Sequence, residues 1–369
     1  MQIERVELRE VRMQLLHPFE TSFGVTRERR ILIVKAIDGD HTGYGEVTAA
    51  EGPFYSHETS ETAWHVLCDF VIPWTVGKNF ERASDFMSLV GSIRGHNMAK
   101  AGMENALWDL EAKQKGLPLW KLLGGERERI ECGVSIGIQP SIDQLLEKID
   151  TEVRAGYKRI KIKIKPGWDL DVIRAVRQAF PRILLMGDAN SAYTLDDIDL
   201  FKQMDRFDIM MFEQPLHWED IIDHAELQKH IETPVCLDES IHSEEDARKA
   251  IDIGACRIIN VKLGRVGGHS HVRAIHNLCR HRGIPVWCGG MLESGIGRAH
   301  NIALSSLGNF SLPGDVSSSK RYWAEDLISP EVEVSASGEL TQRLEPGIGF
   351  EPKEDFIERI TKRTRTFPE

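Results

Sequence analysis

The chain has 369 residues and a formal net charge of −11 at neutral pH. The length allows one large barrel with a smaller domain, and the negative charge excludes nucleic acid and anionic membrane surfaces as expected partners. No apolar run reaches the ~18 to 20 residues that span a bilayer, and the N-terminus lacks the apolar core of a signal peptide, so we expect a cytoplasmic protein.

The first 125 residues predict an α+β domain, in which a run of strands precedes a run of helices. The stretch from His17 to Gly24 contains turn-forming residues around Phe19 and Phe23, and we interpret it as a loop with aromatic anchors. Strands are expected at 1–15, 30–37 and 43–47, a second polar loop at 50–59, and helices from about residue 60 to 123.

Beyond residue 125 strands and helices alternate strictly, which indicates a second domain over residues 126–320. Eight apolar strand-like runs of near-uniform spacing favour a closed (β/α)8 barrel over an open doubly wound sheet. The alternation then ends, and we expect residues 321–369 to pack on the N-terminal domain. The expected strands begin near Glu131, Arg159, Leu184, Met210, Val235, Arg257, Val286 and Ser311.

One strand-like stretch, R-I-K-I-K-I-K-P-G from residue 159 to 167, places lysines at every second position. In a strand, Lys161, Lys163 and Lys165 would all point to one face and the isoleucines to the other. Taken alone, this pattern is typical of an edge strand with a solvated lysine face.

Charged residues in the following runs change that interpretation. Asp188, Glu213, Asp238 and Lys262 each end a short apolar run, and the steps from Lys163 onward are 25, 25, 25 and 24 residues. That step is about the length of one strand, one helix and their turns. The five residues should therefore lie at one depth, at the C-terminal ends of successive strands, where α/β barrels carry their active sites.

The residue types predict the chemistry of this site. Three carboxylates without a His or Cys in register suit Mg²⁺, or alternatively Mn²⁺, rather than Zn²⁺. A substrate carboxylate on the metal would have its α-carbon between two lysines, one of which can remove the α-proton. Burial and the neighbouring cations can lower the pKa of such a lysine, and Lys161 lies beside Lys163.

Short motifs that extend over nearly the whole chain resemble one family. In chain order they read PFETSFG, ALWDL, KIKIKPGWD, GDAN, FEQP, LDES, VKLGRVGG, GGMLESGIGR and PGDVSSS. They are similar to the enolase superfamily, to its muconate-lactonizing subgroup, and within that to the o-succinylbenzoate synthase and N-succinylamino acid racemase family. The resemblance implies that the N-terminal region and the C-terminal tail form a capping domain whose loops close over the barrel.

The resemblance also implies residue roles. Lys163 and Lys262 would be the acid and base, and Lys161 would bind the substrate carboxylate and tune Lys163. Asn190 and Glu239 follow metal-ligand positions and are expected to orient the ligands or Lys163. The implied Mg²⁺ ligands are Asp188, Glu213 and Asp238.

A further set of residues is expected to contact the substrate. Arg265, three residues past Lys262, resembles the form found in family members that racemize. Met291 and Leu292 would line the pocket at the seventh strand end, and Phe19 and Phe23 would approach from the capping domain.

The family implies two reactions on one site, and the substrate in both is a small carboxylate. In the synthase reaction, proposed for menaquinone biosynthesis, Lys163 would remove the α-proton and assist loss of the β-hydroxyl, while Lys262 stabilises the enediolate. In the racemase reaction the two lysines would alternate as base and acid on opposite faces of an N-acylamino acid. We expect the protein to act as a homo-oligomer.

Several alternatives stay open or are disfavoured. Muconate cycloisomerase shares the same five groups, whereas dipeptide epimerases carry an Asp-x-Asp pair where this chain reads Asp315-Val316-Ser317. No His occupies residues 285–291, which disfavours mandelate-type enzymes. The glycines of GRVGG and SGIGR do not form the G-x-G-x-x-G fingerprint of a nicotinamide-dependent dehydrogenase. A barrel that binds an acid without turnover is the remaining alternative.

Overall fold

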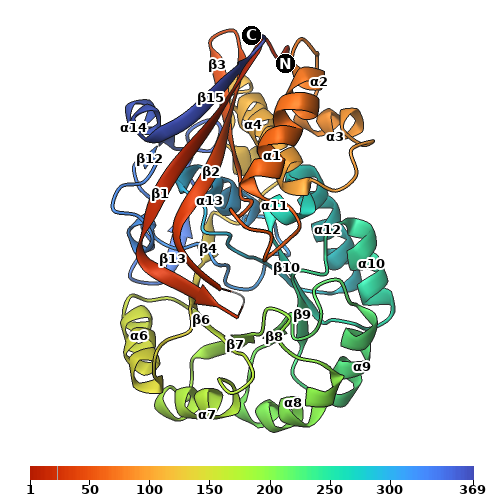
Figure 1. Ribbon diagram of the computed structural model, residues 1–369, viewed down its shortest axis with the longest axis vertical. Coiled ribbons are helices and arrows are strands. Elements are labelled where there is room, and N and C mark those ends of the chain that lie inside the picture. Colours follow the sequence, from red (N-terminus) through yellow and green to blue (C-terminus); the bar gives the residue numbers. More distant parts are fainter. Residues whose placement is uncertain (23) are drawn as a thin grey trace.

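A computed structural model describes residues 1–22 and 24–369. Phe23, predicted to contact substrate, lies outside the described residues. Figure 1 shows long strands and a group of helices above a ring of helices that surrounds a set of shorter strands. Both chain termini lie together at the top of the upper group.

The upper group contains a four-stranded antiparallel sheet, here called the capping sheet, in the order β15-β1-β2-β3. The C-terminal strand β15 pairs with β1, so the two ends of the chain share this sheet. Its strands are β1 (Arg5–Thr21), β2 (Gly24–Asp38), β3 (His41–Val47) and β15 (Thr361–Phe367).

The predicted loop from His17 to Gly24 was wrong, because most of it belongs to a β-hairpin. β1 continues to Thr21 and pairs with β2, with a shift in register between Gln14 and Phe19. Pro18 falls in this irregular stretch, where its missing N–H removes no ladder hydrogen bond. The turn-forming residues therefore mark a bulge within the hairpin instead of a loop.

Helices follow the capping sheet, as predicted for residues 60–123. The longest, α4, lies against β3 so closely that a Cβ atom on Gly45 would come within 2.0 Å of the Gly102 carbonyl oxygen. Only glycine permits this backbone contact. The helices are α1 (Ser60–Val66), α2 (Ile72–Thr75), α3 (Phe86–Leu89), α4 (Asn97–Gln114) and α5 (Leu119–Leu122).

The lower group is a curled parallel sheet in the order β5 to β11, surrounded by helices (Figure 1). The strands are β5 (Gly133–Ile136), β6 (Arg159–Lys163), β7 (Leu184–Asp188), β8 (Phe212–Glu213), β9 (Val235–Leu237), β10 (Ile258–Val261) and β11 (Val286–Cys288). The helices are α6 (Ile142–Arg154), α7 (Leu170–Ala179), α8 (Ile198–Met204), α9 (Ile222–His230), α10 (Glu244–Asp252), α11 (Leu263–Val266), α12 (His269–Arg282) and α13 (Gly295–Leu304).

The eighth barrel position, predicted near Ser311, is occupied by extended chain with a single bridge. Gly314 pairs with Cys132 in parallel fashion, and the Gly133 N–H donates to the Gly314 carbonyl oxygen at 2.7 Å. On the other side, the Asp315 N–H donates to the Cys288 carbonyl oxygen at 2.8 Å. These bonds join the last strand to the first, so the predicted barrel with an α+β cap is confirmed, with its eighth strand reduced to one bridge.

The remaining elements connect the barrel to the cap. They are β4 (Arg129–Glu131), which pairs with β13 (Glu339–Thr341), then β12 (Ile328–Ser329), which pairs with β14 (Glu351–Pro352), and α14 (Glu354–Ile360).

An apolar cluster fills the barrel interior beneath its polar end. It contains Met186, Met211, Cys236, Ile258 and Trp287, all buried. Four of these lie two or four residues before a charged strand-end residue, so strand alternation directs both side chains to the barrel interior. The four strands β7 to β10 and the residues next to them thus contribute an apolar layer below and a charged layer above.

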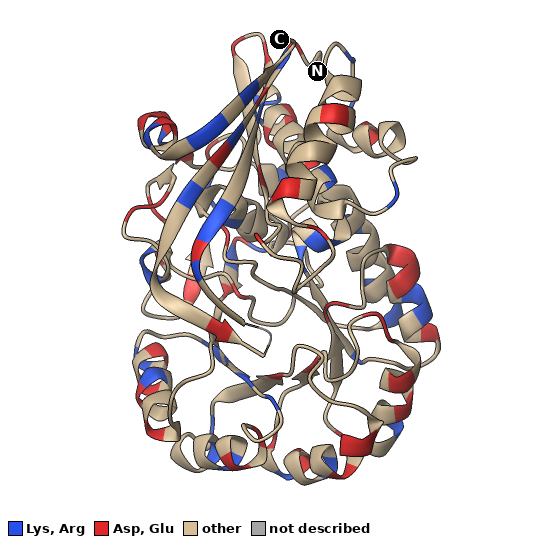
Figure 2. Cartoon of the chain, in the orientation of Figure 1, with Lys and Arg blue, Asp and Glu red and all other residues tan. Residues whose placement is uncertain are grey.

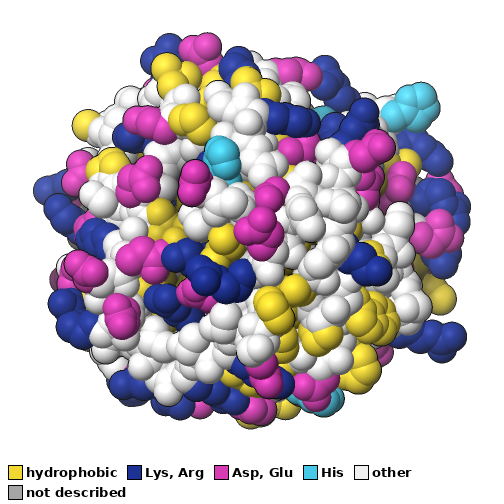
Figure 3. All heavy atoms as spheres, turned by 90° about the horizontal axis from the view of Figure 1, so that it is seen from above, with side chains coloured by type: hydrophobic (Ala, Val, Ile, Leu, Met, Phe, Trp, Pro, Cys, Tyr) yellow, Lys and Arg dark blue, Asp and Glu magenta, His cyan; other side chains and the backbone are white. Residues whose placement is uncertain are grey.

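The surface is mixed in charge. Basic and acidic residues are interspersed over the outer barrel helices in Figure 2, and over the face seen in Figure 3. Within the described part of the chain, no helix combines the length and the apolar character needed to cross a membrane.

Candidate active site

The five charged residues that recur along the sequence lie together at one end of the barrel. Lys163 pairs in register with Asp188, and Asp188 with Glu213, across neighbouring parallel strands. Asp238 and Lys262 directly follow β9 and β10. All five are 7% exposed or less, so their charges are compensated mainly by one another.

Lys163 is held by partners from the barrel. Its Nζ donates to Asp188 Oδ2 at 2.6 Å and to Asn190 Oδ1 at 2.7 Å. Burial alone would raise the pKa of Asp188, but Lys163 and Lys161 hold it below the usual range. Asn190 also donates from Nδ2 to Glu239 Oε1 at 3.0 Å, so the two predicted orienting residues contact each other beside the lysine.

Lys161 lies one layer deeper, among three carboxylates. Its Nζ is 2.9 Å from Glu213 Oε2, 3.2 Å from Asp188 Oδ2 and 3.0 Å from Asp315 Oδ2. Burial alone would lower the pKa of Lys161, but Asp315, Glu213 and Asp188 raise it above the ordinary value. The three carboxylates therefore stabilise the charged form of Lys161.

Asp315 itself was noted in the sequence only as a lone acid. Here its side chain is only 7% exposed, and it pairs with Arg159 at 2.8 Å as well as with Lys161. Ser135 Oγ donates to its Oδ2 at 2.9 Å. Its position after the eighth barrel segment could have indicated a place in the active site, because that segment closes the barrel beside β5.

Lys262 lies opposite, with one partner from the barrel and one from the cap. Its Nζ is 2.7 Å from Asp238 Oδ2 and donates to the Tyr55 hydroxyl at 3.2 Å. Burial opposes its charge, but Tyr55 and the surrounding carboxylates raise its pKa above the ordinary value.

Arg265 lies behind Asp238. Its Nη1 donates to Asp238 Oδ1 and, at 3.3 Å, to the Tyr55 hydroxyl, while Nε donates to the Ile241 carbonyl oxygen at 2.7 Å. Arg265 is 2% exposed and is not among the described residues lining the cavity that contains the lysines. Its contacts act on Asp238 and on the surroundings of Lys262.

Two amide side chains that the sequence did not indicate hold the residues that carry the carboxylates, one through a side chain and one through the backbone. Asn260 Nδ2 donates to Glu213 Oε1 at 2.6 Å, and Gln214 Oε1 accepts from the Asp238 N–H at 2.9 Å. A Cβ atom on Gly289 would lie 2.3 Å from Asn260 Oδ1, so glycine leaves the space that this amide occupies. Neither amide has a periodic signal of its own.

Left-handed backbone conformations gather at these strand ends. The residues are Asn190, Ser191, Gln214 and Leu292, with φ of 42°, 64°, 39° and 56°. Such conformations are unfavourable for non-glycine residues and cluster at functional sites. Here the first three follow directly after β7 and β8, where the chain turns to present the carboxylates.

A small cavity of about 50 Å³ separates the lysines. Phe19 reaches it from the capping sheet and Leu292 from the loop after β11, whereas Met291 is not among the described residues that line it. The lining residues are Phe19, Ser135, Lys161, Lys163, Lys262, Gly290, Leu292, Glu293, Arg298, Asp315 and Tyr322.

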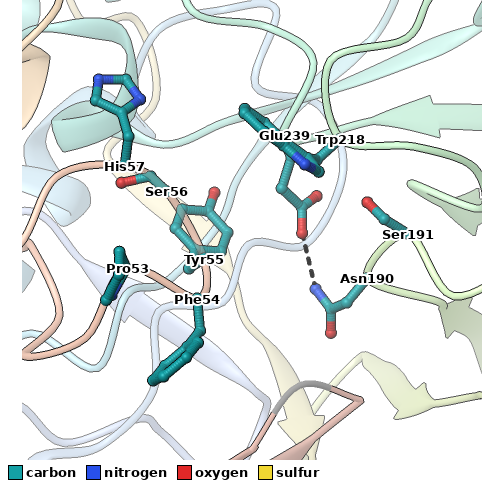
Figure 4. A pocket seen from close by; sticks show the side chains of 9 residues that line it. All are labelled: Pro53, Phe54, Tyr55, Ser56, His57, Asn190, Ser191, Trp218 and Glu239. Atoms are coloured by element: carbon teal, nitrogen blue, oxygen red, sulfur yellow. Dashed lines mark hydrogen bonds between the residues drawn. The ribbon is translucent and has the colours of Figure 1, made fainter.

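A larger cavity of about 370 Å³ lies on the other side of Asn190 and Tyr55 (Figure 4). One wall comes from the 50–59 loop, with Pro53, Phe54, Tyr55, Ser56 and His57. The opposite wall comes from barrel loops, with Asn190, Ser191, Trp218 and Glu239. Because Asn190 and Tyr55 each contact one of the two lysines, this cavity adjoins the charged cluster.

The carboxylates fit a hard divalent cation in the chemistry of their donors. Asp188, Glu213 and Asp238 offer oxygen atoms from three adjacent strands, the ligand type that Mg²⁺ prefers. Glu239 Oε2, next to Asp238, is buried without a hydrogen-bond partner among the described residues. In residues 1–22 and 24–369 no three His, Cys, Asp or Glu side chains are arranged closely enough to hold an ion. Lysine amines instead pair with all three carboxylates.

Comparison with known proteins agrees with this geometry. Residues 144–356 match the family model of the enolase C-terminal domain-like proteins, and residues 3–124 match that of the mandelate racemase / muconate lactonizing enzyme N-terminal domain.

Individual relatives are similar over nearly their full lengths. The chain is 52% identical to an o-succinylbenzoate synthase of Geobacillus kaustophilus, covering 99% of this chain and 97% of that protein. It is 45% identical to an N-succinylamino acid racemase of Thermus thermophilus, covering 98% of each. A crystal structure of an enolase superfamily member from Listeria innocua superposes with a TM-score of 0.96 at 40% identity, covering 99% of both chains. The chain is therefore an enzyme of the enolase superfamily and belongs to the family of o-succinylbenzoate synthases and N-succinylamino acid racemases.

Proposed function

We propose that the enzyme removes a proton α to a carboxylate in a Mg²⁺-dependent reaction, with both o-succinylbenzoate synthase and N-succinylamino acid racemase activities. The observation that carries the proposal is the pair Lys163 and Lys262, which line one cavity and contact carboxylates from opposite sides. The identities of 52% and 45% to proteins with these two names support it.

Asp188, Glu213 and Asp238 are the residues that would hold Mg²⁺. When bound, the ion supplies electrostatic stabilisation for the negative charge that develops as the α-proton leaves. Lys161, whose amine now lies among Glu213, Asp188 and Asp315, is placed to bind the substrate carboxylate. Asn190 orients Lys163 through its Oδ1.

In the racemase reaction Lys163 takes the α-proton from one face of an N-acylamino acid, and Lys262 returns a proton to the other. The reverse direction exchanges their roles. In the synthase reaction Lys163 takes the α-proton and then gives a proton to the departing β-hydroxyl, which leaves as water. Lys262 remains cationic there and stabilises the enediolate.

A specific contact favours racemization as a full activity. Arg265 reaches both Asp238 and Tyr55, the two groups that contact Lys262. It is thereby placed to adjust the charge and position of the lysine that only racemization uses as a base.

Asp315 argues against dipeptide epimerization. An epimerase would need free acids at this place to hold a substrate ammonium group. Asp315 is instead occupied by two internal cations, Arg159 and Lys161, and Ser317 stands where a second acid would be required.

Proton NMR of N-succinyl-L-phenylalanine in D₂O with enzyme and Mg²⁺ tests the proposal, alongside a spectrophotometric synthase assay. We expect loss of the α-proton signal together with loss of optical rotation, and both should stop when a chelator is added. Synthase turnover without exchange would make this a dedicated synthase, the enzyme of menaquinone biosynthesis. Inactivity in both assays would reject the proposal and favour muconate cycloisomerase or another acid substrate.

A further inference from the structure

Tyr55 connects the cap to the charged cluster. It lies on the 50–59 loop, whose ends are tied together by a bridge between Ala50 and Thr59. The loop reaches over the barrel mouth, and Figure 4 shows Tyr55 between the other loop side chains and the barrel residues Asn190 and Glu239.

The hydroxyl of Tyr55 contacts three charged groups of the barrel. It donates to Asp238 Oδ1 at 3.0 Å, and it accepts from Lys262 Nζ at 3.2 Å and from Arg265 Nη1 at 3.3 Å. The Lys262 amine also lies 4.4 Å from the centroid of the tyrosine ring, within the range of a cation–π interaction. Tyr55 therefore restrains this amine both through its hydroxyl and through its ring.

The other lysine has no such partner in the described part of the cap. Lys163 is held by two barrel residues, Asp188 at the end of β7 and Asn190 in the loop that follows it. The two bases thus differ in what positions them. Among the contacts of the described residues, Lys262 is the one of the two lysines that depends on the 50–59 loop.

We propose that Tyr55 is a positioning residue for Lys262 and not for Lys163, so that docking of the 50–59 loop determines the competence of one base only. This inference rests on the proposed two-base racemase function. Its consequence is an asymmetry: loss of the tyrosine hydroxyl slows proton removal from the enantiomer that faces Lys262. Removal from the other enantiomer uses Lys163 and continues. Synthase turnover also continues, because it uses Lys163 as its base and needs only the charge of Lys262, which the substitution leaves in place.

The test compares α-proton exchange of the L and D enantiomers of N-succinylphenylalanine in D₂O. The Lys262→Ala variant exchanges only the enantiomer that Lys163 deprotonates, and this assigns each enantiomer to its base. In Tyr55→Phe we expect the exchange rate constant of the Lys262 enantiomer to fall about tenfold, the usual effect of losing a hydrogen bond to a charged group. The exchange of the Lys163 enantiomer should change less than about twofold.

Three further variants distinguish a loss of Lys262 positioning from general damage to the active site. Tyr55→Ala also removes the ring and should lose more exchange at Lys262 than Tyr55→Phe. Asn190→Ala, which removes a partner of Lys163, should show the opposite preference. Glu51 lies on the same loop and pairs with Arg12 at 3.8 Å. The Glu51→Gln variant should therefore behave as the wild type. Equal loss for both enantiomers in Tyr55→Phe would overturn the inference, since that would indicate a general effect through Asp238.

A second measurement is independent of turnover. Limited acylation with acetic anhydride, read by mass spectrometry, reports the accessibility of each amine. We expect Lys262 to be acylated faster in Tyr55→Phe and Lys163 to be unchanged. Absence of exchange in the wild type would reject the racemase proposal, and the acylation result would still decide the role of Tyr55: an unchanged rate at Lys262 would overturn it.

Discussion

Glu46 in the capping sheet accepts two hydrogen bonds from Ser294 of the barrel, at 3.1 Å from the N–H and 2.6 Å from the hydroxyl. Ser294 is the N-cap residue of α13, so a carboxylate of the cap meets the N-terminus of a barrel helix. Gly297 adds a third N–H at 2.9 Å. The contact joins residues separated by 248 positions and anchors the cap beside the active site.

This contact predicts a pH-dependent stability. Burial raises the pKa of Glu46 from its ordinary value of 4.5 to about 8. Between these values the folded protein retains a proton that the unfolded chain has released, so the contribution of Glu46 to stability declines as pH rises from about 4.5 to 8. Glu46→Gln lacks this titration. In thermal unfolding the Tm of the wild type should fall relative to that of the variant across this range, and the corresponding loss of unfolding free energy should be on the order of 1 kcal/mol or more. Parallel profiles would contradict the prediction.

The paired lysines give a prediction for activity. Lys163→Ala and Lys262→Ala should each reduce racemization by at least about a thousandfold, since each removes an acid or base on one face of the substrate. Lys262→Arg keeps the charge and should retain part of the synthase activity. Steady-state assays of both reactions on the same preparations check this. Full racemization in either alanine variant would reject the two-base assignment.

Asp315 gives a prediction for stability. Asp315→Ala would leave Arg159 and Lys161 buried with one fewer counter-charge, and we expect a loss of about 3 kcal/mol in the free energy of unfolding. A matched control is Glu126→Gln, which breaks a 2.7 Å pair with Arg280 whose side chains are 53% and 55% exposed. Exposed pairs contribute little, so the control should change by less than about 0.5 kcal/mol. Urea unfolding measures both, and similar losses would contradict the prediction.

Much of the barrel could be predicted from the sequence because its signal is periodic. The spacing from Lys163 to Lys262 repeats one βα unit, and strand alternation carries Met186 and Asp188 to the same interior. The predictions for the eighth strand and for the segment around Pro18 were less accurate. A single bridge and a bulge leave little periodic pattern in the sequence.

The other half of the site could not be predicted, because its contacts join distant parts of the chain. Tyr55 reaches Lys262 across 207 positions, and no local pattern marks that pairing. Asn260 and Gln214 act through single hydrogen bonds. The domain boundary near residue 125 and the homo-oligomeric state stay predictions, the latter open to light scattering.

The close packing of β3 against α4 within the cap predicts that one added methyl group severely lowers stability. Gly45→Ala would place a Cβ atom 2.0 Å from the Gly102 carbonyl oxygen and 2.8 Å from the Ala106 nitrogen. Since both are backbone atoms of α4, neither can move alone, and we expect a loss above about 3 kcal/mol or failure to accumulate as soluble protein. Gly91→Ala, whose nearest neighbour would be at 3.3 Å, is the control and should fold. Soluble yield and Tm distinguish the two, and a fully stable Gly45→Ala protein would contradict the packing.

Removal of the metal ligands gives a prediction that does not depend on activity. A ligand that binds only the folded protein raises the unfolding free energy by about 2.7 kcal/mol at a concentration of 100 Kd. Mg²⁺ should therefore raise the Tm of the wild type, and a chelator should reverse the shift. Asp188→Asn and Glu213→Gln each remove a charged oxygen ligand, so the shift should be lost or displaced to much higher Mg²⁺ concentrations. Asp171→Asn, at an exposed position on α7, should retain the full shift. A Mg²⁺ response that is the same in all four proteins would place the ion elsewhere and leave the three strand-end carboxylates without the role assigned to them.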